Sequence, residues 1–146
     1  MEKELTKCVK RLMDPIIKIA DLLRLEVKYE NGKVNGEELI KVVNKYLVRD
    51  INNRDVFLPA CVRSVFEVLN QLDYDLALIF NSLNEIDEKQ RHIFYLIHFK
   101  KMTEQEIAKK NKTNQSNVNR AKRRAYFQLN ERLVLNKWYK DSNKQE

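Results

Sequence analysis

The hydrophobic residues of the chain recur mostly three or four positions apart, the spacing that lines one face of an α-helix. This pattern predicts a short helix over residues 3–13, then a second helix that Asp14 caps and that has Pro15 at its first position. Three later stretches predict further helices. The apolar faces of these four helices are Ile16, Ile19, Ala20, Leu23 and Val27; Leu39, Val43, Tyr46 and Leu47; Leu58, Val62, Val65, Leu69 and Leu72; and Leu76, Ile79, Phe80 and Leu83. We interpret them as core positions.

Both glycines of the chain lie in the segment ENGKVNGEE, which is the clearest break in the helical pattern. Its Asn31–Gly32 pair suits either the C-terminal cap of a helix or the turn of a β-hairpin. We favour the cap, because the preceding LEVKYE is too short to indicate a strand. Asn35 can cap the next helix. A second break, RDINNRD, predicts a loop, and a further helix starts near Phe57 or Pro59.

The composition favours a helical protein with a real core. Hydrophobic residues make up 43% of the 146 residues, and only 2 glycines and 2 prolines are present, which argues against a turn-rich all-β fold. The predicted fold class is therefore all-α. The apolar runs are too short to span a bilayer, and the first residues lack the features of a signal peptide. We expect a cytoplasmic protein that contacts no membrane.

The sequence offers little catalytic or metal-binding chemistry. Cys8 and Cys61 lie far apart within apolar patterns, which favours buried free thiols. His92 and His98 are six residues apart on one predicted helix, so they do not share a face, and no cysteine is near them in the sequence. The chain also lacks a glycine-rich phosphate loop and a nucleophile motif. We therefore expect no metal, no cofactor and no enzymatic activity.

The net charge of +7 is unevenly placed along the chain. Residues 1–82 contain 13 Lys and Arg against 13 Asp and Glu, whereas residues 83–146 contain 15 against 8 and carry the whole excess. A neutral half joined to a basic half indicates a module that binds a polyanion, preceded by a module of another kind.

The basic half begins with two helix starts. Asp87 and Gln90 have the spacing of a capping box, and a second box is predicted from Thr103 and Glu106. The first of the two helices would bury Ile93, Leu96, Ile97 and the ring of Phe94 or Tyr95. The second would turn Ile107 and the small Ala108 inward, where a close helix crossing needs little side-chain volume.

A third helix in this half combines an apolar face with a basic polar face. Asn114 is a suitable N-cap. The inward positions are Val118, Ala121, Ala125, Leu129 and Leu133, and the opposite face carries Gln115, Ser116, Asn119, Arg120 and Arg123. Gln, Asn and Arg can make paired hydrogen bonds to base edges. A merely solvated helix would more often carry Glu–Lys pairs, yet no acidic residue occurs between Thr113 and Asn130. The pattern therefore favours entry into a DNA groove.

These residues resemble a known family. Thr103-x-x-Glu-Ile-Ala, then Asn114 at the cap, Val118 four residues later and Arg124–Ala125 beyond, are similar to the C-terminal promoter-binding domain, region 4, of sigma-70 factors. The resemblance covers roughly residues 83–133. It implies a helix-turn-helix on double-stranded DNA. The implied base-reading residues are Gln115, Ser116, Asn119 and Arg120, and the expected phosphate contacts are Thr103, Lys109, Lys110, Lys112, Lys122 and Arg123.

The resemblance also implies RNA polymerase as a partner, through the helix near Ile93–Phe99. Two departures from the family concern the turn. Asn111 stands where the family has an apolar residue, and Lys112 stands where it has glycine. Because Asn tolerates the left-handed backbone that glycine adopts, Asn111 could take this conformation, and the turn would then be displaced by one residue. Residues 1–82 show no aromatic-rich basic helix of the kind that melts promoters. The chain therefore resembles a small regulator, similar in size to phage-encoded late-gene activators of Gram-positive hosts.

The sequence suggests three parts: a helical dimerisation or partner-binding region at 1–82, the helix-turn-helix at 83–135 and a polar tail at 136–146. Two alternatives stay open. Residues 1–82 would either form a homodimer or another partner-binding module, or simply buttress the basic half in one shared core. The basic helix would either bind DNA or, as in a sigma mimic or anti-sigma factor, bind an acidic protein surface of the transcription machinery.

Overall fold

A computed structural model of the chain describes residues 2–48, 60–71 and 75–144, with side chains at 9–44, 63–69, 71 and 75–137. Within these ranges the chain forms seven helices and one two-stranded sheet, so the fold is mostly α-helical. The elements in order are α1 (Glu2–Leu22), β1 (Lys28–Glu30), β2 (Lys33–Asn35), α2 (Glu37–Val48), α4 (Ala60–Gln71), α5 (Leu76–Leu83), α6 (Glu88–His98), α7 (Glu104–Lys110) and α8 (Gln115–Lys144).

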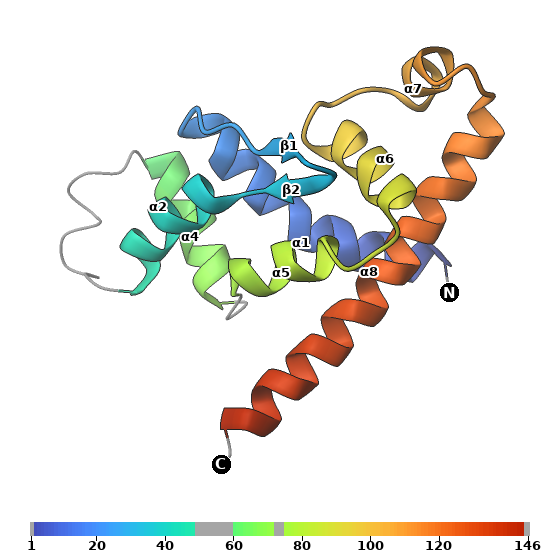
Figure 1. Cartoon of the computed structure of the whole chain (residues 1–146). Helices are drawn as coiled ribbons and strands as arrows, with labels where there is room; N and C mark the ends of the chain where they lie inside the picture. The colour runs from blue at the N-terminus through green and yellow to red at the C-terminus, as the bar shows by residue number, and fades with distance from the viewer. Residues whose placement is uncertain (1, 49–59, 72–74, 145–146) are drawn as a thin grey trace.

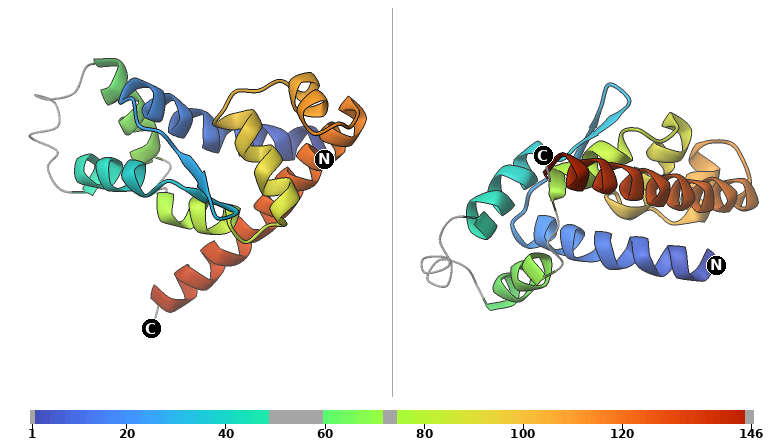
Figure 2. Two further views of the ribbon diagram at one scale, coloured as in Figure 1. Left: turned by 45° about the horizontal axis from the view of Figure 1, so that its top comes forward. Right: turned by 90° about the horizontal axis from the view of Figure 1, so that it is seen from below.

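The long helix α8 organises the molecule. It contacts α1, α5, α6 and α7, which pack against successive parts of its length (Figure 1). The short helix α7 lies at one end, beside the start of α8, whereas α2, α4 and the hairpin lie toward the other side. The last turns of α8 extend beyond the body of the molecule in Figure 1 and in the left view of Figure 2.

The hydrophobic core of the described residues forms one cluster that runs across the expected boundary at residues 82 and 83. Met13 and Ile16 of α1 belong to the same cluster as Phe94 of α6 and Leu129 of α8. This continuity favours the alternative in which residues 1–82 share a core with the basic half. The division of the chain into a partner-binding region at 1–82 and a helix-turn-helix at 83–135 stays a prediction.

The prediction of two helices at the N-terminus is wrong, because α1 continues from Glu2 to Leu22 with Pro15 inside it. An interior proline costs a helix about 3 kcal/mol, since it lacks the amide proton and its ring crowds the preceding turn. The buried stripe of α1 nevertheless continues through this position, with Met13, Ile16 and Ile19 at most 1% exposed. Each such side chain stabilises the fold by about 1.5–3 kcal/mol when buried, so tertiary packing outweighs the proline.

The favoured helix cap at Asn31–Gly32 is also wrong, and the hairpin alternative is the one observed. Strands β1 and β2 pair antiparallel with Tyr29 opposite Val34. Asn31 and Gly32 have φ values of 54° and 75°, as a two-residue turn of type I′ requires. Asn35 behaves as expected at the start of α2, where its side chain accepts a hydrogen bond from the Glu37 amide at 3.0 Å.

The hairpin is held by three side chains of the basic half, a contact region that we call the junction. The Asn84 side-chain amide bonds to both the N–H and the C=O of Val34, at 2.8 and 2.9 Å, and so acts as a neighbouring strand would. Arg91 is 8% exposed and donates to the carbonyls of Gly32, Asn84 and Ile86 at 2.7–3.0 Å. The Tyr95 hydroxyl donates to the Val27 carbonyl at 2.9 Å. This external support explains why so short a strand pair forms.

Most predicted core positions are confirmed wherever side chains are described. Those that are buried include Ile16, Ile19, Ala20, Val27, Leu39, Val43, Val65, Leu69, Leu76, Ile79, Phe80 and Leu83, while Leu23 is half-buried. Val27 is buried outside the helix predicted for it, just before β1. Some predicted positions have side chains that lie outside the described residues: Cys8, Tyr46, Leu47, Leu58, Cys61, Val62 and Leu72. The segment RDINNRD and the expected helix start at Phe57 or Pro59 also lie outside them.

Candidate nucleic-acid interface

Helix α7 starts at the capping box that the sequence predicts. The Thr103 hydroxyl accepts a hydrogen bond from the Glu106 amide at 3.1 Å, and the Glu106 carboxylate accepts one from the Thr103 amide at 3.4 Å. Ile107 and Ala108 are buried, as expected. These local bonds fix where α7 begins and direct its apolar side toward α8, which it contacts.

The turn between α7 and α8 does not shift. Lys112 itself takes the left-handed conformation with φ 55°, whereas Asn111 has φ −91°. The Thr113 amide bonds to the Ala108 carbonyl at 2.9 Å and the Lys112 amide to the Lys109 carbonyl at 3.3 Å, a Schellman ending. A residue with a side chain pays about 1–2 kcal/mol for this conformation, whereas glycine does not. The surrounding hydrogen bonds therefore hold Lys112 in a backbone conformation that glycine would adopt without strain.

The predicted start and inward face of α8 are confirmed. The Asn114 side chain accepts a hydrogen bond from the Asn117 amide at 2.8 Å. The five inward positions, Val118, Ala121, Ala125, Leu129 and Leu133, are all buried. Because α-helical geometry fixes the opposite face once these positions are buried, the first turns of α8 present their polar side chains outward.

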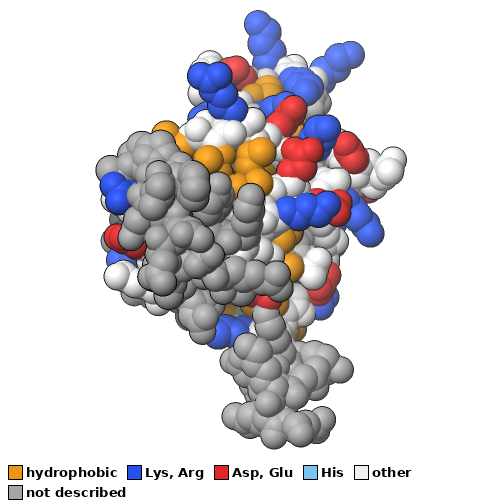
Figure 3. All heavy atoms as spheres, turned by 90° about the vertical axis from the view of Figure 1, so that its left-hand side faces the viewer, with side chains coloured by type: hydrophobic (Ala, Val, Ile, Leu, Met, Phe, Trp, Pro, Cys, Tyr) orange, Lys and Arg blue, Asp and Glu red, His pale blue; other side chains and the backbone are white. Residues whose placement is uncertain are grey.

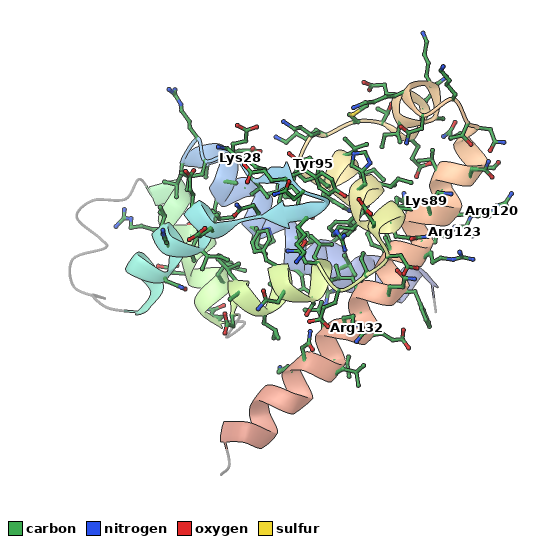
Figure 4. The ribbon with its side chains drawn as sticks, in the orientation of Figure 1. Lys28, Lys89, Tyr95, Arg120, Arg123 and Arg132 are labelled. Carbon is green, nitrogen blue, oxygen red and sulfur yellow. The ribbon has the colours of Figure 1, made fainter. Side chains whose placement is uncertain are left out.

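The predicted contact residues lie together at one end of the molecule, which we call the tip: α7 with its N-cap Thr103, the turn, and residues 115–123 of α8. Gln115, Ser116 and Arg120 are exposed there. Arg120 and Arg123 extend from the outer side of α8 (Figure 4). Lys109, Lys110 and Lys112 are exposed around the end of α7, and Thr103 is exposed at its start. The tip therefore brings the ten predicted residues into one region.

Two of the predicted contact residues are already bonded to Glu104, a residue that the sequence analysis did not single out. The Glu104 carboxylate accepts from Lys122 Nζ at 2.7 Å and from Asn119 Nδ2 at 3.1 Å. Burial alone would raise the pKa of this carboxyl, but the bonds from Lys122 and Asn119 outweigh it and lower the pKa below its usual value. Asn119 is half-buried, and its Oδ1 accepts from Arg123 Nε at 2.7 Å.

Charge is distributed differently away from the tip. On the side that faces left in Figure 1, acidic and basic side chains are interspersed over the part of the surface that the structure describes (Figure 3). Charged side chains also pair between segments distant in sequence, for example Lys100 with Glu26 at 3.2 Å and Lys101 with Asp21. Residues 104–123 contain six Lys and Arg against two Glu, so a large part of the basic excess lies at the tip.

The capping box predicted at the start of α6 does not form. Asp87 is the N-cap of this helix but makes no side-chain capping bond. Its carboxylate accepts instead from Gln128 Nε2 of α8 at 2.9 Å, and its amide donates to Gln128 Oε1 at 3.3 Å. Gln90, the expected second member of the box, is buried. The local spacing was right for a cap, but a partner distant in sequence occupies the carboxylate.

A buried pair behind the tip also escaped the sequence analysis. His98 Nε2 lies 2.8 Å from the hydroxyl of Tyr126, so α6 and α8 are joined by a hydrogen bond within the core. Burial, together with the positive charges of Lys122 and Lys10, lowers the pKa of His98 to about 4. Burial also raises the pKa of Tyr126 to about 12. Near neutral pH both side chains are therefore uncharged.

Residues 76–129 match the family model described as Sigma-70, region 4. Comparison with curated proteins gave no match, and comparison with solved structures gave none either. The matched segment is a sigma-70 region 4-like helix-turn-helix domain, a DNA-binding regulatory module of transcription rather than an enzyme family. The match includes α5, which the resemblance noted from the sequence had left out, and ends at Leu129.

Two further findings bear on the expected partners. No helix in the described ranges is long and apolar enough to cross a membrane. Among the side chains that the structure describes, no group of three or more His, Cys, Asp and Glu is arranged to hold a metal ion.

Proposed function

We propose that the protein is a transcriptional regulator that binds duplex DNA by placing the first turns of α8 in the major groove. One observation supports this above the others. Gln115, Ser116 and Arg120 are exposed on α8, which Asn114 caps at its start and whose apolar face is buried in the core. Side chains on a rigid helix can be presented to base edges at a fixed depth and angle, as specific reading of a groove requires.

The exposed lysines of the tip support the same proposal. Lys109, Lys110 and Lys112 surround the end of α7, and the exposed Thr103 at the start of this helix is a fourth candidate phosphate contact. Phosphate contacts position a protein on DNA without reading its sequence. Lys122 and Arg123 complete the proposed set, although Lys122 must exchange its ion pair with Glu104 for a phosphate.

RNA polymerase is the second proposed partner, and a phage late-gene activator remains our proposed biological role. The helix suggested for the polymerase contact is α6, but Ile93, Phe94, Tyr95 and Leu96 are buried in the core of the chain itself. Ile97 and Phe99 are half-buried and adjoin the surface. A polymerase contact on this helix would therefore use its C-terminal end. A cytoplasmic location and a homodimer are part of the proposal.

The test is DNA selection followed by salt titration. The full chain should enrich one motif from random duplex DNA, and its affinity for that motif should fall with salt as phosphate contacts are lost. Arg120→Ala should cost roughly 1–3 kcal/mol on the selected motif and relax the preference at one base pair. Enrichment of no motif by the full chain would refute specific DNA binding.

The alternative is a protein-interaction module of the sigma-mimic or anti-sigma type. The observation that favours it is the bonding of Glu104 to Asn119 and Lys122, which occupies two of the predicted DNA contacts within the protein. This alternative predicts binding to purified transcription proteins with no motif enriched from random DNA. The same selection experiment therefore separates the two functions.

A further inference from the structure

The two edges of the hairpin differ in how their backbone groups are paired. On the β2 edge, the Asn84 side chain bonds to the N–H and the C=O of Val34 at 2.8 and 2.9 Å and so closes this edge. On the β1 edge, Tyr29 is the residue opposite Val34. Residues opposite each other in an antiparallel pair either exchange both backbone bonds or direct both groups outward. Because Val34 directs its groups to Asn84, Tyr29 directs its own N–H and C=O away from β2.

These two backbone groups of Tyr29 are available for pairing. The described residues supply no hydrogen-bond partner for either group, and the sheet that they form has two strands. An unpaired N–H and C=O on a strand edge form a template on which a further strand can pair. Since β1 has three residues, backbone bonds alone would hold a further strand weakly, and specific binding needs contacts from side chains as well.

A pocket of about 550 Å³ adjoins the β1 edge. On one side it is lined by residues 26 and 28–30 and by no residue of β2. The other side comes from α6 and the residues that follow it: His92, Tyr95, Leu96, Lys100, Met102 and Lys110. The Tyr95 hydroxyl donates to the Val27 carbonyl at 2.9 Å, which places α6 beside this edge. Because α6 bounds the pocket on its far side, the space suits one extended strand better than the two strands of a second hairpin.

The side chains of β1 define what such a strand should carry. The Tyr29 ring turns inward, with its centroid 4.8 Å from that of His92 and 5.3 Å from that of Tyr95. Side chains alternate along a strand, so Lys28 and Glu30 turn outward, and both are exposed. A strand paired antiparallel with β1 would therefore have an apolar residue beside Tyr29, an acidic residue opposite Lys28 and a basic residue opposite Glu30. From its N-terminus, this segment has the order basic, apolar, acidic.

We propose that the open edge of β1 binds an extended segment of another protein as a third strand of the sheet, with the residue order basic, apolar, acidic. The central residue exchanges two backbone hydrogen bonds with Tyr29, and its side chain lies against the pocket wall at His92 and Leu96. The backbone bonds hold the segment, and the two charged pairs select its sequence. This site goes beyond the proposed function and does not depend on DNA binding.

The test is an NMR titration of the isotope-labelled full chain with the acetylated and amidated peptide Ser-Lys-Leu-Glu-Ser. The Tyr29 amide signal should shift and its hydrogen exchange should slow, because the Tyr29 N–H gains an acceptor. The peptide Ser-Glu-Leu-Lys-Ser has the same composition and net charge with the charged residues exchanged, and it should bind about tenfold more weakly. N-methylation of the leucine removes the donor to the Tyr29 carbonyl and should also weaken binding about tenfold.

A double variant of the protein tests the charged pairs from the other side. Lys28→Glu combined with Glu30→Lys exchanges the two exposed charges without changing the net charge, so the variant should prefer Ser-Glu-Leu-Lys-Ser by about tenfold. Glu37→Lys combined with Lys41→Glu is the matched control. It exchanges an exposed pair on α2, 3.4 Å apart, and should leave the preference of the wild type unchanged.

The outcomes separate the proposal from its alternatives. A shifted Tyr29 amide, together with a peptide preference that reverses in the double variant, supports it. An unchanged Tyr29 amide at millimolar peptide overturns it, and so does equal affinity for the N-methylated peptide or for the two charge orders. A Tyr29 amide that is already protected in the free protein, with a dimer in sedimentation, also overturns it, because a second copy of the chain then occupies the edge. Each of these results leaves the test of DNA binding unaffected.

Discussion

The junction and the tip are both built from polar side chains, but they use them in opposite ways. At the junction Asn84, Arg91 and Tyr95 bond to backbone atoms of residues 27–34 and of nearby turns, and Arg91 and Tyr95 are buried. At the tip the bonds of Glu104, Asn119 and Arg123 join side chain to side chain, close to solvent. Bonds to backbone in the interior hold a fold together, whereas bonded side chains at a surface can exchange one partner for another.

This comparison indicates where a substitution should affect folding and where it should affect binding. A buried donor that loses its partners carries a large penalty, while exposed pairs contribute little. We therefore expect the junction to dominate stability and the tip to dominate recognition.

Cutting the chain after residue 82 separates the two sides of the junction and should have the largest effect on folding. The shared core and the junction bonds predict that fragment 1–82 loses cooperative folding, because α1 would lose α8 and the hairpin would lose α6. Circular dichroism during thermal unfolding, with the full chain as control, measures this. A fragment that unfolds cooperatively would support independent modules, and sedimentation would then show whether it dimerises.

Arg91→Ala tests the junction at a single residue. The substitution removes hydrogen bonds to three carbonyls, of which that of Ile86 is buried and those of Gly32 and Asn84 are partly buried, so we expect it to lower the free energy of unfolding by about 3 kcal/mol. Arg132→Ala is the control, because its ion pair with Glu85 at 3.7 Å is exposed and should contribute less than about 0.5 kcal/mol. Urea denaturation compares the two variants. Equal effects would show that the junction is not a special source of stability.

The buried pair of His98 and Tyr126 predicts a pH dependence of stability. Because the folded-state pKa of His98 is lowered to about 4 from 6.5, protonation is disfavoured by folding. The contribution of neutral His98 to the free energy of unfolding is complete above pH 6.5 and is lost as the pH falls toward 4. About 2 kcal/mol of this free energy should be lost between pH 7 and pH 5. Urea titrations of the wild type and of His98→Gln at both pH values check this. The variant should lose less stability on acidification, and an equal loss in both proteins would assign the pH effect to other groups.

Lys112→Gly tests the turn at the tip, where we expect the smallest change in stability. Glycine takes the left-handed conformation of this turn without strain, so the variant should gain about 1 kcal/mol in free energy of unfolding. Lys109→Gly, inside α7, should instead lose about 1 kcal/mol. Both variants remove one candidate phosphate contact, so each should reduce the salt dependence of DNA binding by about one unit of slope. A stabilised variant with unchanged salt dependence would exclude Lys112 as a phosphate contact.

Features that depend on neighbours in the sequence could be predicted from it. The capping box of Thr103 and Glu106, the Asn114 cap and the buried face of α8 follow from spacings of three and four residues, and the structure confirms each. The same spacings directed attention to the outer face of α8, because a helix that buries one side must expose the other. The basic excess after residue 82 could likewise be counted from the sequence alone.

Features that depend on partners distant in sequence were decided only by the tertiary structure. Asp87 had the spacing of a cap, yet its carboxylate bonds to Gln128, and the hairpin forms because Asn84, Arg91 and Tyr95 support it from the other half of the chain. Glu104 and Asn119 are 15 positions apart, and no local pattern shows that they meet. A local bond requires little loop closure, whereas a distant one forms only after the core has brought its two ends together. Local patterns in the sequence thus indicate where α7 and α8 begin and which face of α8 is polar, and the packing of the core decided which polar side chains bond to one another.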